Sequence, residues 1–480
     1  MPSRGVHPWQ DARPVTAAGR PIPDDQAEPP APTLLRSLGA VDGALITIGA
    51  TVGSGIFLTT GDIAQRCPQP ALILGLWAAG GLFALAGALA YAELGAMFPR
   101  AGGLYHFLKE AYGRVWGFLF GWASFLVIMT GGISAIAVGF GEYLGAFVPS
   151  LGSGVELFSG AIAGVRWKVT GPQMTGAVAV LALTGVNWLG LREGALVQNV
   201  ATVLKFGALL VLVVVGLSAP APVAPTWGAP LPPGSVVAAL GLGLVAVLWT
   251  YDGWYVLTFS AGEVRRPERN LPRGLVLGVT AVAALYLAIN WVYLKALDLR
   301  TLSGTSRVGE AAAAALLGPG AARAVTLVIL LSMFGCLAAN VLCCARIYLP
   351  MAEDGLFFRA IARIHPRHHT PSNSLLAQGV LAAAIALSGT YAELYTTVIF
   401  AQVLFHAATA AAVFVLRWKR PHATRPFRAW GHPWSTGAFV VACLVVASVT
   451  LVQAPVRSML GLAIIAAGLP AYAWWSRTAR

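Results

Sequence analysis

The nine residues GATVGSGIF, at positions 49–57, interrupt a long apolar segment with three glycines and a serine. Glycine lets a backbone leave helical geometry without steric cost, so this stretch predicts a break inside a helix over residues 39–64. A second interruption, LWTYDGWYV at positions 248–256, places Asp252-Gly253 inside another apolar segment. Interrupted segments at corresponding places in two halves of a membrane protein are typical of a binding site at the bilayer midplane.

The composition indicates that both breaks lie in a membrane. Of the 480 residues, 57% are hydrophobic and only 11% charged, and the mean hydropathy is +0.72. Soluble domains carry about 25% charged residues, so a soluble enzyme is excluded. The apolar residues suffice for roughly twelve spans of about 20 residues each, without the alternation of barrel strands. The predicted fold class is therefore all-α integral membrane, with twelve transmembrane helices centred on 39–64, 71–97, 115–147, 173–189, 195–217, 235–261, 275–296, 323–350, 374–388, 391–416, 435–453 and 457–475.

The distribution of lysine and arginine predicts how the chain is oriented in the membrane. Twelve spans put both termini on one side, and an inside N-terminus assigns 23 lysines and arginines to inner segments and 8 to outer ones. The positive-inside rule then predicts a multi-pass plasma-membrane protein with both termini in the cytoplasm. The net charge of +13 thus needs no nucleic-acid partner. Residues 1–35 are proline-rich without an apolar core, which predicts a disordered cytoplasmic tail rather than a signal peptide.

Lys205 lies inside the fifth apolar segment, thirteen residues beyond Arg192. A lysine near a helix end can extend to the membrane interface, but this one is predicted to lie deep. A buried intramembrane lysine usually faces a cavity or a partner. We therefore expect Lys205 to occupy a cation-like position inside the bundle.

The breaks themselves predict a ligand. An unwound stretch exposes amide groups at the start of the following half-helix, where the helix dipole favours an anion such as a carboxylate. It also exposes carbonyls at the end of the preceding half-helix, which suit an ammonium group. A zwitterionic amino acid carries both groups on one carbon. Glycines for tight helix packing are the alternative, which explains Gly80-Gly81 but not an aspartate in mid-membrane.

The first break resembles the first-helix signature of the amino acid–polyamine–organocation superfamily. Four further stretches are similar to its bacterial and L-type amino acid transporter branch. They are AYAELGAMFPRAGGLYHFLKEAYG (90–113), AGEVRRPERNLPRG (261–274), MAEDGLFFRAIARIHP (351–366) and RPFRAWGHPW (425–434). The resemblance implies a five-plus-five inverted repeat with broken helices 1 and 6. The repeats would cover 36–218 and 235–416, with peripheral helices 11 and 12 in 434–475 and a cytoplasmic C-terminus at 476–480.

The resemblance also implies a substrate site at the two breaks and a role for Lys205. The substrate carboxylate would meet the amides of Ser54, Gly55 and Ile56, and its amino group the carbonyls of Thr51, Trp249 and Asp252. Lys205 matches the fifth-helix lysine that stands, in many sodium-independent relatives, where sodium-coupled ones place a cation. The remaining candidates are Gly53 and Gly253 in the unwound backbone, with Tyr251 and Trp254 to close or line the pocket. The Asp252 carboxylate either binds the substrate ammonium or caps the following half-helix.

Other functions and partners are less compatible with the sequence. An intramembrane enzyme would need a catalytic set such as HExxH or paired acids, and a channel would need a filter sequence or polar rings; neither is visible. No cofactor or metal is expected. Light-chain relatives carry a cysteine in the loop that corresponds to 148–172, which has none here, so no disulfide-linked ancillary subunit is expected. The resulting hypothesis is sodium-independent exchange of small or neutral L-amino acids. The alternative is proton-coupled symport, with cationic amino acids or polyamines left open by Asp252.

Overall fold

A computed structural model describes residues 35–162, 165–189, 191–220, 236–305, 307–453 and 455–478. The predicted disordered tail lies outside these residues except for its last position. Residues 221–235, which include the predicted start of the second repeat, and the last two residues of the chain lie outside them as well.

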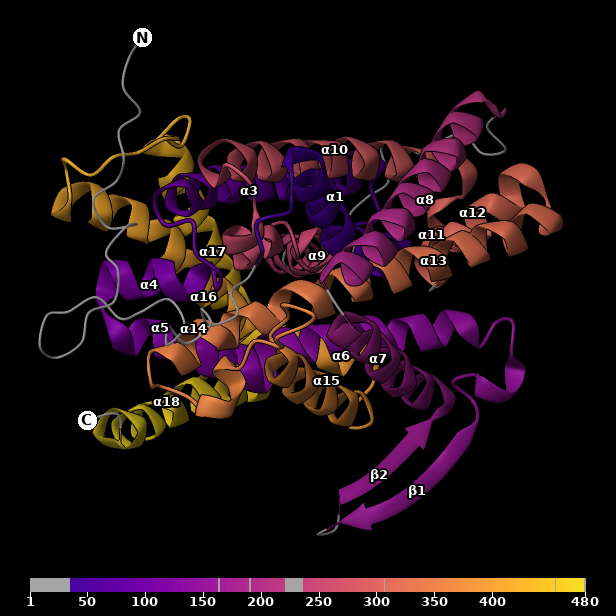
Figure 1. Ribbon diagram of the computed structural model, residues 1–480. Coiled ribbons are helices and arrows are strands. Elements are labelled where there is room, and N and C mark those ends of the chain that lie inside the picture. Colours follow the sequence, from indigo (N-terminus) through magenta and orange to yellow (C-terminus); the bar gives the residue numbers. More distant parts are fainter. Residues whose placement is uncertain are drawn as a thin grey trace, which may run out of the picture. The chain divides into compact units, whose positions relative to one another are not determined.

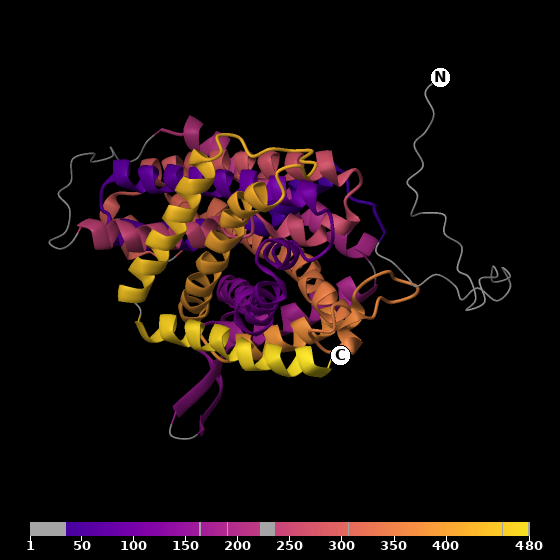
Figure 2. The same cartoon turned by 90° about the vertical axis from the view of Figure 1, so that its left-hand side faces the viewer.

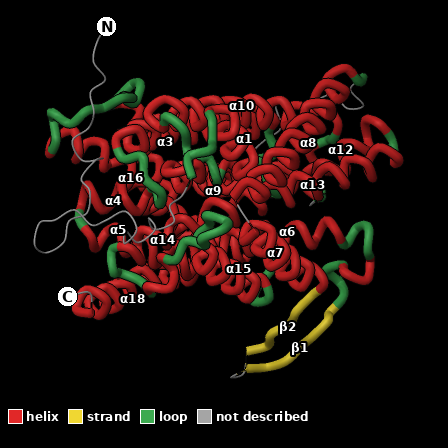
Figure 3. Tube along the Cα trace, in the orientation of Figure 1, coloured by secondary structure: helices red, strands yellow, loops and turns green. Residues whose placement is uncertain are grey.

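Helices make up most of the described chain (Figures 1 and 3). The α-helices are α1 Ala40–Thr51, α2 Gly55–Arg66, α3 Pro70–Met97, α4 Leu104–Tyr112, α5 Arg114–Ala123, α6 Met129–Leu144, α7 Gly171–Leu189, α8 Leu191–Ser218, α9 Val236–Tyr251, α10 Pro267–Ala296, α11 Leu299–Gly304, α12 Val308–Leu317, α13 Pro319–Cys344, α14 Tyr348–Glu353, α15 Ser372–Ala386, α16 Tyr391–Lys419, α17 Trp434–Gln453 and α18 Pro455–Thr478. The π-helix η1 (Ser124–Ile128) joins α5 to α6, and the 3-10 helix η3 (Val256–Glu263) follows α9; further 3-10 turns are η2 Pro149–Leu151, η4 Ala345–Ile347 and η5 Arg359–Ala362.

Eight helical segments within the described residues are long and apolar enough to cross a membrane, or nine if α1 and α2 form one bent span. Two further predicted spans contain shorter apolar helices, Thr202–Ser218 and Ser372–Ala386. The chain is thus a multi-pass helical membrane protein, and the count of twelve stays a prediction. The last two helices are the least covered, with 33% and 17% of their apolar windows buried. In Figure 2, α17 and α18 are the yellow helices along the near side.

Small residues allow the helices around the breaks to cross closely. A Cβ atom on Gly278 of α10 would lie only 2.5 Å from the Thr47 Cβ of α1. A Cβ atom on Gly176 of α7 would lie 2.8 Å from the Ala137 backbone of α6. Because lipid tails are as apolar as leucine, membrane helices associate mainly through such close packing. The glycines thereby bring α1, α6 and their neighbours together around the interior of the bundle.

The structure also contains elements that the sequence did not predict. Strands β1 (Glu156–Ile162) and β2 (Val165–Thr170) form an antiparallel hairpin between α6 and α7, in which Ser159 pairs with Lys168. The hairpin projects away from the helices in Figure 1. The Trp167 indole donates to the Leu387 carbonyl at 2.9 Å, which fastens it beside the end of α15. The all-α fold class is confirmed for the apolar segments, and the hairpin lies in a loop for which the sequence analysis predicted no secondary structure.

Candidate functional site

Both predicted breaks are present and touch each other. α1 ends at Thr51, α2 begins at Gly55, and the two helices are bent by 45°. α9 ends at Tyr251 and Gly253 has a φ of +102°, in the region that side chains rarely adopt. A Cβ atom on Gly253 would lie 2.6 Å from the Ala50 carbonyl oxygen. Glycine is therefore required at 253 both for the turn and for the contact with the first break.

Lys205 of α8 holds the carbonyl end of the first break. Its ammonium is fully buried and donates to the carbonyl of Gly49 at 2.7 Å and of Val52 at 2.6 Å. A longer bond of 3.4 Å reaches the Ser332 carbonyl. The last carbonyls of a helix have no partner within it, and a cation there is favoured by the helix dipole. Lys205 thus places a positive charge where α1 exposes its oxygens, and it does not extend to the membrane interface.

The neighbouring carbonyls of the first break have partners on two other helices. Cys336 of α13 donates its thiol to the Ala50 carbonyl at 3.0 Å, and the Asn340 amide approaches the same oxygen at 3.4 Å. The Tyr286 hydroxyl of α10 donates to the Thr51 carbonyl at 2.9 Å and approaches the Thr250 carbonyl at 3.1 Å. Three helices therefore satisfy the carbonyl end of α1.

The amide end of the break is arranged differently. Ser54 is the N-cap of α2, and no side chain caps this helix. The first amide groups of a helix have no partner within it and favour an anion. A cavity of about 30 Å³ adjoins this helix start. It is lined by Ala50, Thr51, Gly53, Ser54, Gly55, Ile128, Met129, Gly132, Ile133, Ile136, Trp249, Thr250, Asp252, Tyr255, Cys336 and Asn340.

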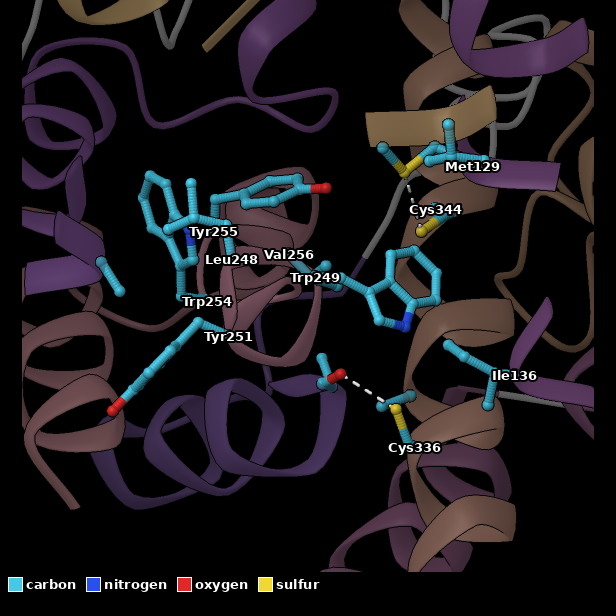
Figure 4. Packing of buried hydrophobic residues seen from close by; sticks show 14 of the residues in the cluster. Met129, Ile136, Leu248, Trp249, Tyr251, Trp254, Tyr255, Val256, Cys336 and Cys344 are labelled. Atoms are coloured by element: carbon cyan, nitrogen blue, oxygen red, sulfur yellow. Dashed lines mark hydrogen bonds between the residues drawn. The ribbon is translucent and has the colours of Figure 1, made fainter. Parts of the chain in front are cut away.

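A tyrosine joins the two breaks beside the cavity. The Tyr391 hydroxyl, at the start of α16, lies 2.9 Å from the Ser54 hydroxyl. It also accepts a hydrogen bond of 2.9 Å from the Trp249 indole nitrogen. Figure 4 shows Trp249 pointing toward Cys336 and Ile136, across the space between the broken segment and α13. Tyr391 therefore fixes the position of the aromatic ring that covers one side of the cavity.

Asp252 lies between this cavity and a second, apolar one, whose lining includes Phe83, Trp254 and Val403. The Gln402 amide of α16 donates to the Asp252 carboxylate. The same amide contacts the Tyr255 hydroxyl at 2.5 Å and lies 3.2 Å from the His406 ring. The carboxylate is thus part of a buried polar network.

Comparison of the sequence with known proteins assigns the chain to a family. The sequence profile described as "Amino acid permease" matches residues 38–473, which cover both breaks, Lys205 and the polar residues of α13. The chain belongs to the amino acid permease family. It is therefore a membrane protein of the amino acid–polyamine–organocation superfamily that transports amino acids.

Three relatives match this permease over most of their length. It is 29% identical over 448 residues to the serine/threonine exchanger SteT of Bacillus subtilis, covering 92% of this chain and 96% of the relative. It is 30% identical to the human b(0,+)-type amino acid transporter 1, covering 90% and 85%. It is 28% identical to the human large neutral amino acids transporter small subunit 2, covering 92% and 80%.

Apart from Lys205, the predicted site residues of the permease divide into three groups. Those that line the cavity are Thr51, Gly53, Ser54, Gly55, Trp249 and Asp252. Ile56 and Gly253 are buried within the breaks. Tyr251 and Trp254 point to the opposite side in Figure 4. The Tyr251 hydroxyl donates to the Trp77 carbonyl at 3.1 Å, and the Trp254 ring lies 4.8 Å from that of Tyr91.

Gly55 lines the cavity and also packs closely against α9. A Cβ atom there would lie 2.4 Å from the Thr250 hydroxyl and 2.8 Å from the Thr250 Cα. Gly55 is therefore needed for the contact between α2 and α9, and a side chain at this position disrupts the packing of the two broken helices.

Sequence reasoning missed the polar residues of the permease that lie outside the breaks. Ser332, Cys336 and Asn340 are four residues apart on α13 and face the first break together. This spacing places them on one helix face, so the signal was a polar stripe inside the apolar segment 323–350. Tyr391 and Tyr286 each lie among several other polar residues of the segments 391–416 and 275–296, and no local pattern distinguishes them from those neighbours.

Proposed function

We propose that this permease carries small or neutral L-amino acids across the plasma membrane by sodium-independent exchange and alternating access. The proposal includes twelve spans with cytoplasmic termini, in two inverted repeats at 36–218 and 235–416. Helices in 434–475 would remain peripheral. The serine/threonine exchanger SteT supports both the exchange mode and a small substrate, since the two chains align over most of their length.

The observation that carries sodium independence is the contact of Lys205 with the first break. Its ammonium lies 2.7 and 2.6 Å from the carbonyl oxygens of Gly49 and Val52. Carbonyl oxygens of an unwound helix are typical ligands for a coupling cation in broken-helix transporters. A lysine that already donates to these oxygens supplies their positive charge permanently. Transport through such a site needs no dissolved sodium ion to complete it.

The arrangement of the breaks supports a zwitterionic substrate. We place its carboxylate at the amides of Ser54, Gly55 and Ile56, where the dipole of α2 favours negative charge. Its amino group then meets the carbonyls of Thr51, Trp249 and Asp252. The Thr51 carbonyl already accepts from Tyr286, but a carbonyl oxygen has two lone pairs and accepts a second hydrogen bond.

Charge at the cavity favours a neutral side chain. Asp252 is the one acidic residue among those that line the two described cavities, and the Gln402 amide already donates to it. An apolar or hydroxyl-bearing side chain leaves this hydrogen bond intact. All five cysteines are buried and unpaired, so we also propose transport without a disulfide-linked subunit.

Asp252 also supports the second candidate, a proton-coupled symporter that accepts cationic amino acids or polyamines. If the substrate ammonium or guanidinium displaces the Gln402 amide, Asp252 provides the opposite charge inside the membrane. Lys205 is then the group that loses its proton in one conformation. A Lys205→Ala protein that still accumulates substrate under a proton gradient contradicts this mechanism.

The experiment that separates the candidates is uptake of a labelled amino-acid panel into proteoliposomes in sodium-free buffer. Uptake that requires unlabelled amino acid inside the vesicles supports exchange and identifies the substrates. Uptake into empty vesicles that rises with an inward proton gradient supports symport instead. Loss of all transport without sodium would contradict the sodium-independent proposal.

Asp252→Asn is the matched variant for substrate charge. The asparagine side chain keeps the size and one hydrogen-bond acceptor but removes the negative charge. Neutral substrates should then keep a KM within a few-fold of wild type, whereas any lysine or arginine transport should disappear. Equal loss of both classes would show that Asp252 acts on the helix break and not on the substrate.

A further inference from the structure

One buried ion pair lies away from the cavity and joins elements that surround it. The Arg346 Nε atom of η4 donates to the Glu263 Oε1 atom of η3 at 2.8 Å, and both side chains are fully buried. Among the described residues, the second oxygen of Glu263 and the Arg346 Nη2 atom have no hydrogen-bond partner. Buried charges are costly unless all their polar atoms are satisfied. The desolvation cost of the two charges therefore offsets much of their attraction, so this pair contributes little net stability while it joins η3 to η4.

Glu263 is also bonded to the segment that leads into α1. Its backbone carbonyl accepts from the amides of Ser37 at 2.9 Å and Leu38 at 3.0 Å. The Arg265 amide donates to the Leu38 carbonyl at 2.8 Å, and Leu38 forms an isolated parallel bridge with Val264. Glu263 thus contacts the segment before α1 through its backbone carbonyl and η4, which directly follows α13, through its side chain.

Residues of α1 and α13, and the turn that leads into η3, also line the cavity. Thr51 and Asp252 lie at the breaks and Asn340 lies on α13. The twelve residues of α1 span about 18 Å, which separates the Glu263 contacts from the cavity. The positive-inside orientation puts this end of α1 at the cytoplasmic face. The contacts of Glu263 therefore close the end of the bundle through which substrate must reach the cytoplasm.

We propose that Glu263 and Arg346 form a cytoplasmic latch, a positioning pair that holds the inward path closed and separates during each transport cycle. The latch consists of this ion pair together with the backbone bonds between Glu263 and residues 37 and 38. It rests on the proposed alternating-access function. Its opening frees the start of α1 from the end of η3, so that the two can move apart while the break near Lys205 remains the pivot.

The chain carries its own reporters of this opening. Cys343 and Cys344 precede Arg346 on α13 and are buried. In Glu263→Gln the side chain keeps its shape but loses its charge. We expect a membrane-impermeant maleimide to modify these thiols about tenfold faster in inside-out vesicles, because a hydrogen bond between charged groups has been weakened. Labelling in right-side-out vesicles should not rise. Mass spectrometry of the peptides identifies the modified thiol.

Two comparisons make the result specific. Glu110→Gln removes a partly exposed ion pair, Arg420–Glu110 at 2.8 Å, and should leave labelling at the wild-type rate. The double variant Glu263→Gln/Arg346→Gln should label no faster than Glu263→Gln alone, since both changes release the same contact. If Glu263→Gln does not fold, Leu38→Pro removes one backbone donor to Glu263 and should accelerate labelling with the ion pair intact.

Unchanged labelling in a monodisperse Glu263→Gln protein would overturn the latch, as would faster labelling from the outer face alone. The labelling experiment needs no substrate or ion gradient. If the permease proves to be a symporter, the labelling result still tests the latch. If the wild-type permease exchanges normally but Glu263→Gln labels at the wild-type rate, the latch is refuted and the proposed exchange is not.

Discussion

Replacing Lys205 with methionine tests the central electrostatic feature of the site. Methionine fills nearly the same volume but donates no hydrogen bond. The carbonyls of Gly49 and Val52 then lose bonds of 2.7 and 2.6 Å, while the 3.4 Å contact with Ser332 contributes less. The Val52 carbonyl keeps a 3.4 Å bond from the Ser332 hydroxyl, whereas the Gly49 carbonyl loses its side-chain donor. An orphaned buried polar group costs about 1–3 kcal/mol, so we expect the break to be destabilised by about that much. We expect exchange to be abolished, because the amide end of the break shifts with the carbonyl end.

The matched control is Lys295→Met. Lys295 also donates to three backbone carbonyls, those of Gly216, Leu217 and Ala219, but it is partly exposed at the far end of α10. Exchange in proteoliposomes and thermal unfolding in detergent should be measured for both variants. Lys295→Met should transport at a rate within a few-fold of wild type. Wild-type exchange by Lys205→Met would refute the reasoning, because the break would then hold its geometry without the ammonium.

Three further predictions concern stability and affinity. His106→Gln should make the stability of the folded protein less sensitive to acid. Burial, and after it the charge of Lys109, lowers the pKa of His106 to about 4. Between pH 7 and 5 the unfolded chain therefore binds a proton that the folded chain does not, which lowers the free energy of unfolding of the wild type by about 2 kcal/mol. A thermal-unfolding series against pH checks this, and an equal acid sensitivity in both proteins would exclude His106. Gly253→Ala should abolish substrate binding in isothermal titration, since its methyl group would meet the Ala50 carbonyl at 2.6 Å and its φ is +102°; wild-type affinity would contradict the contact between the breaks. Tyr391→Phe removes the hydroxyl beside Ser54 and should raise KM about five- to tenfold at an unchanged protein level, as expected for the loss of one or two hydrogen bonds; an unchanged KM would make that hydroxyl irrelevant to the site.

The sequence predicted those features that depend on a residue's own backbone or charge. Glycines 49, 53 and 55 and the Asp252-Gly253 pair predicted the two breaks because glycine permits backbone that other residues avoid. Lys205 was predicted to be buried because a charge in the middle of an apolar segment needs a partner. The length and hydropathy of the segments predicted a helical membrane protein, because a helix forms all of its backbone hydrogen bonds within one segment.

Features that depend on contacts between distant segments were not predictable from the sequence. Trp249 and Tyr251 are both aromatic residues close to Asp252 in the sequence, but they point in different directions. Trp249 lines the cavity, whereas Tyr251 donates to the Trp77 carbonyl on the opposite side. Their directions follow from the turn at Gly253 and from the position of α3, which no local pattern encodes. The β-hairpin was missed because its loop lies outside the apolar segments, where a two-stranded unit gives only a weak local signal.

The two ends of the first break differ in how the protein satisfies them, and this difference bears on the substrate. Gly49, Ala50, Thr51 and Val52 expose carbonyls that accept from Lys205, Cys336 and Tyr286, so three helices hold this end. The start of α2 has no side-chain cap. A ligand therefore adds more at the amide end than at the carbonyl end. In the proposed binding mode the substrate carboxylate would therefore supply the dominant attraction, and its amino group would set the orientation by sharing oxygens that already have partners.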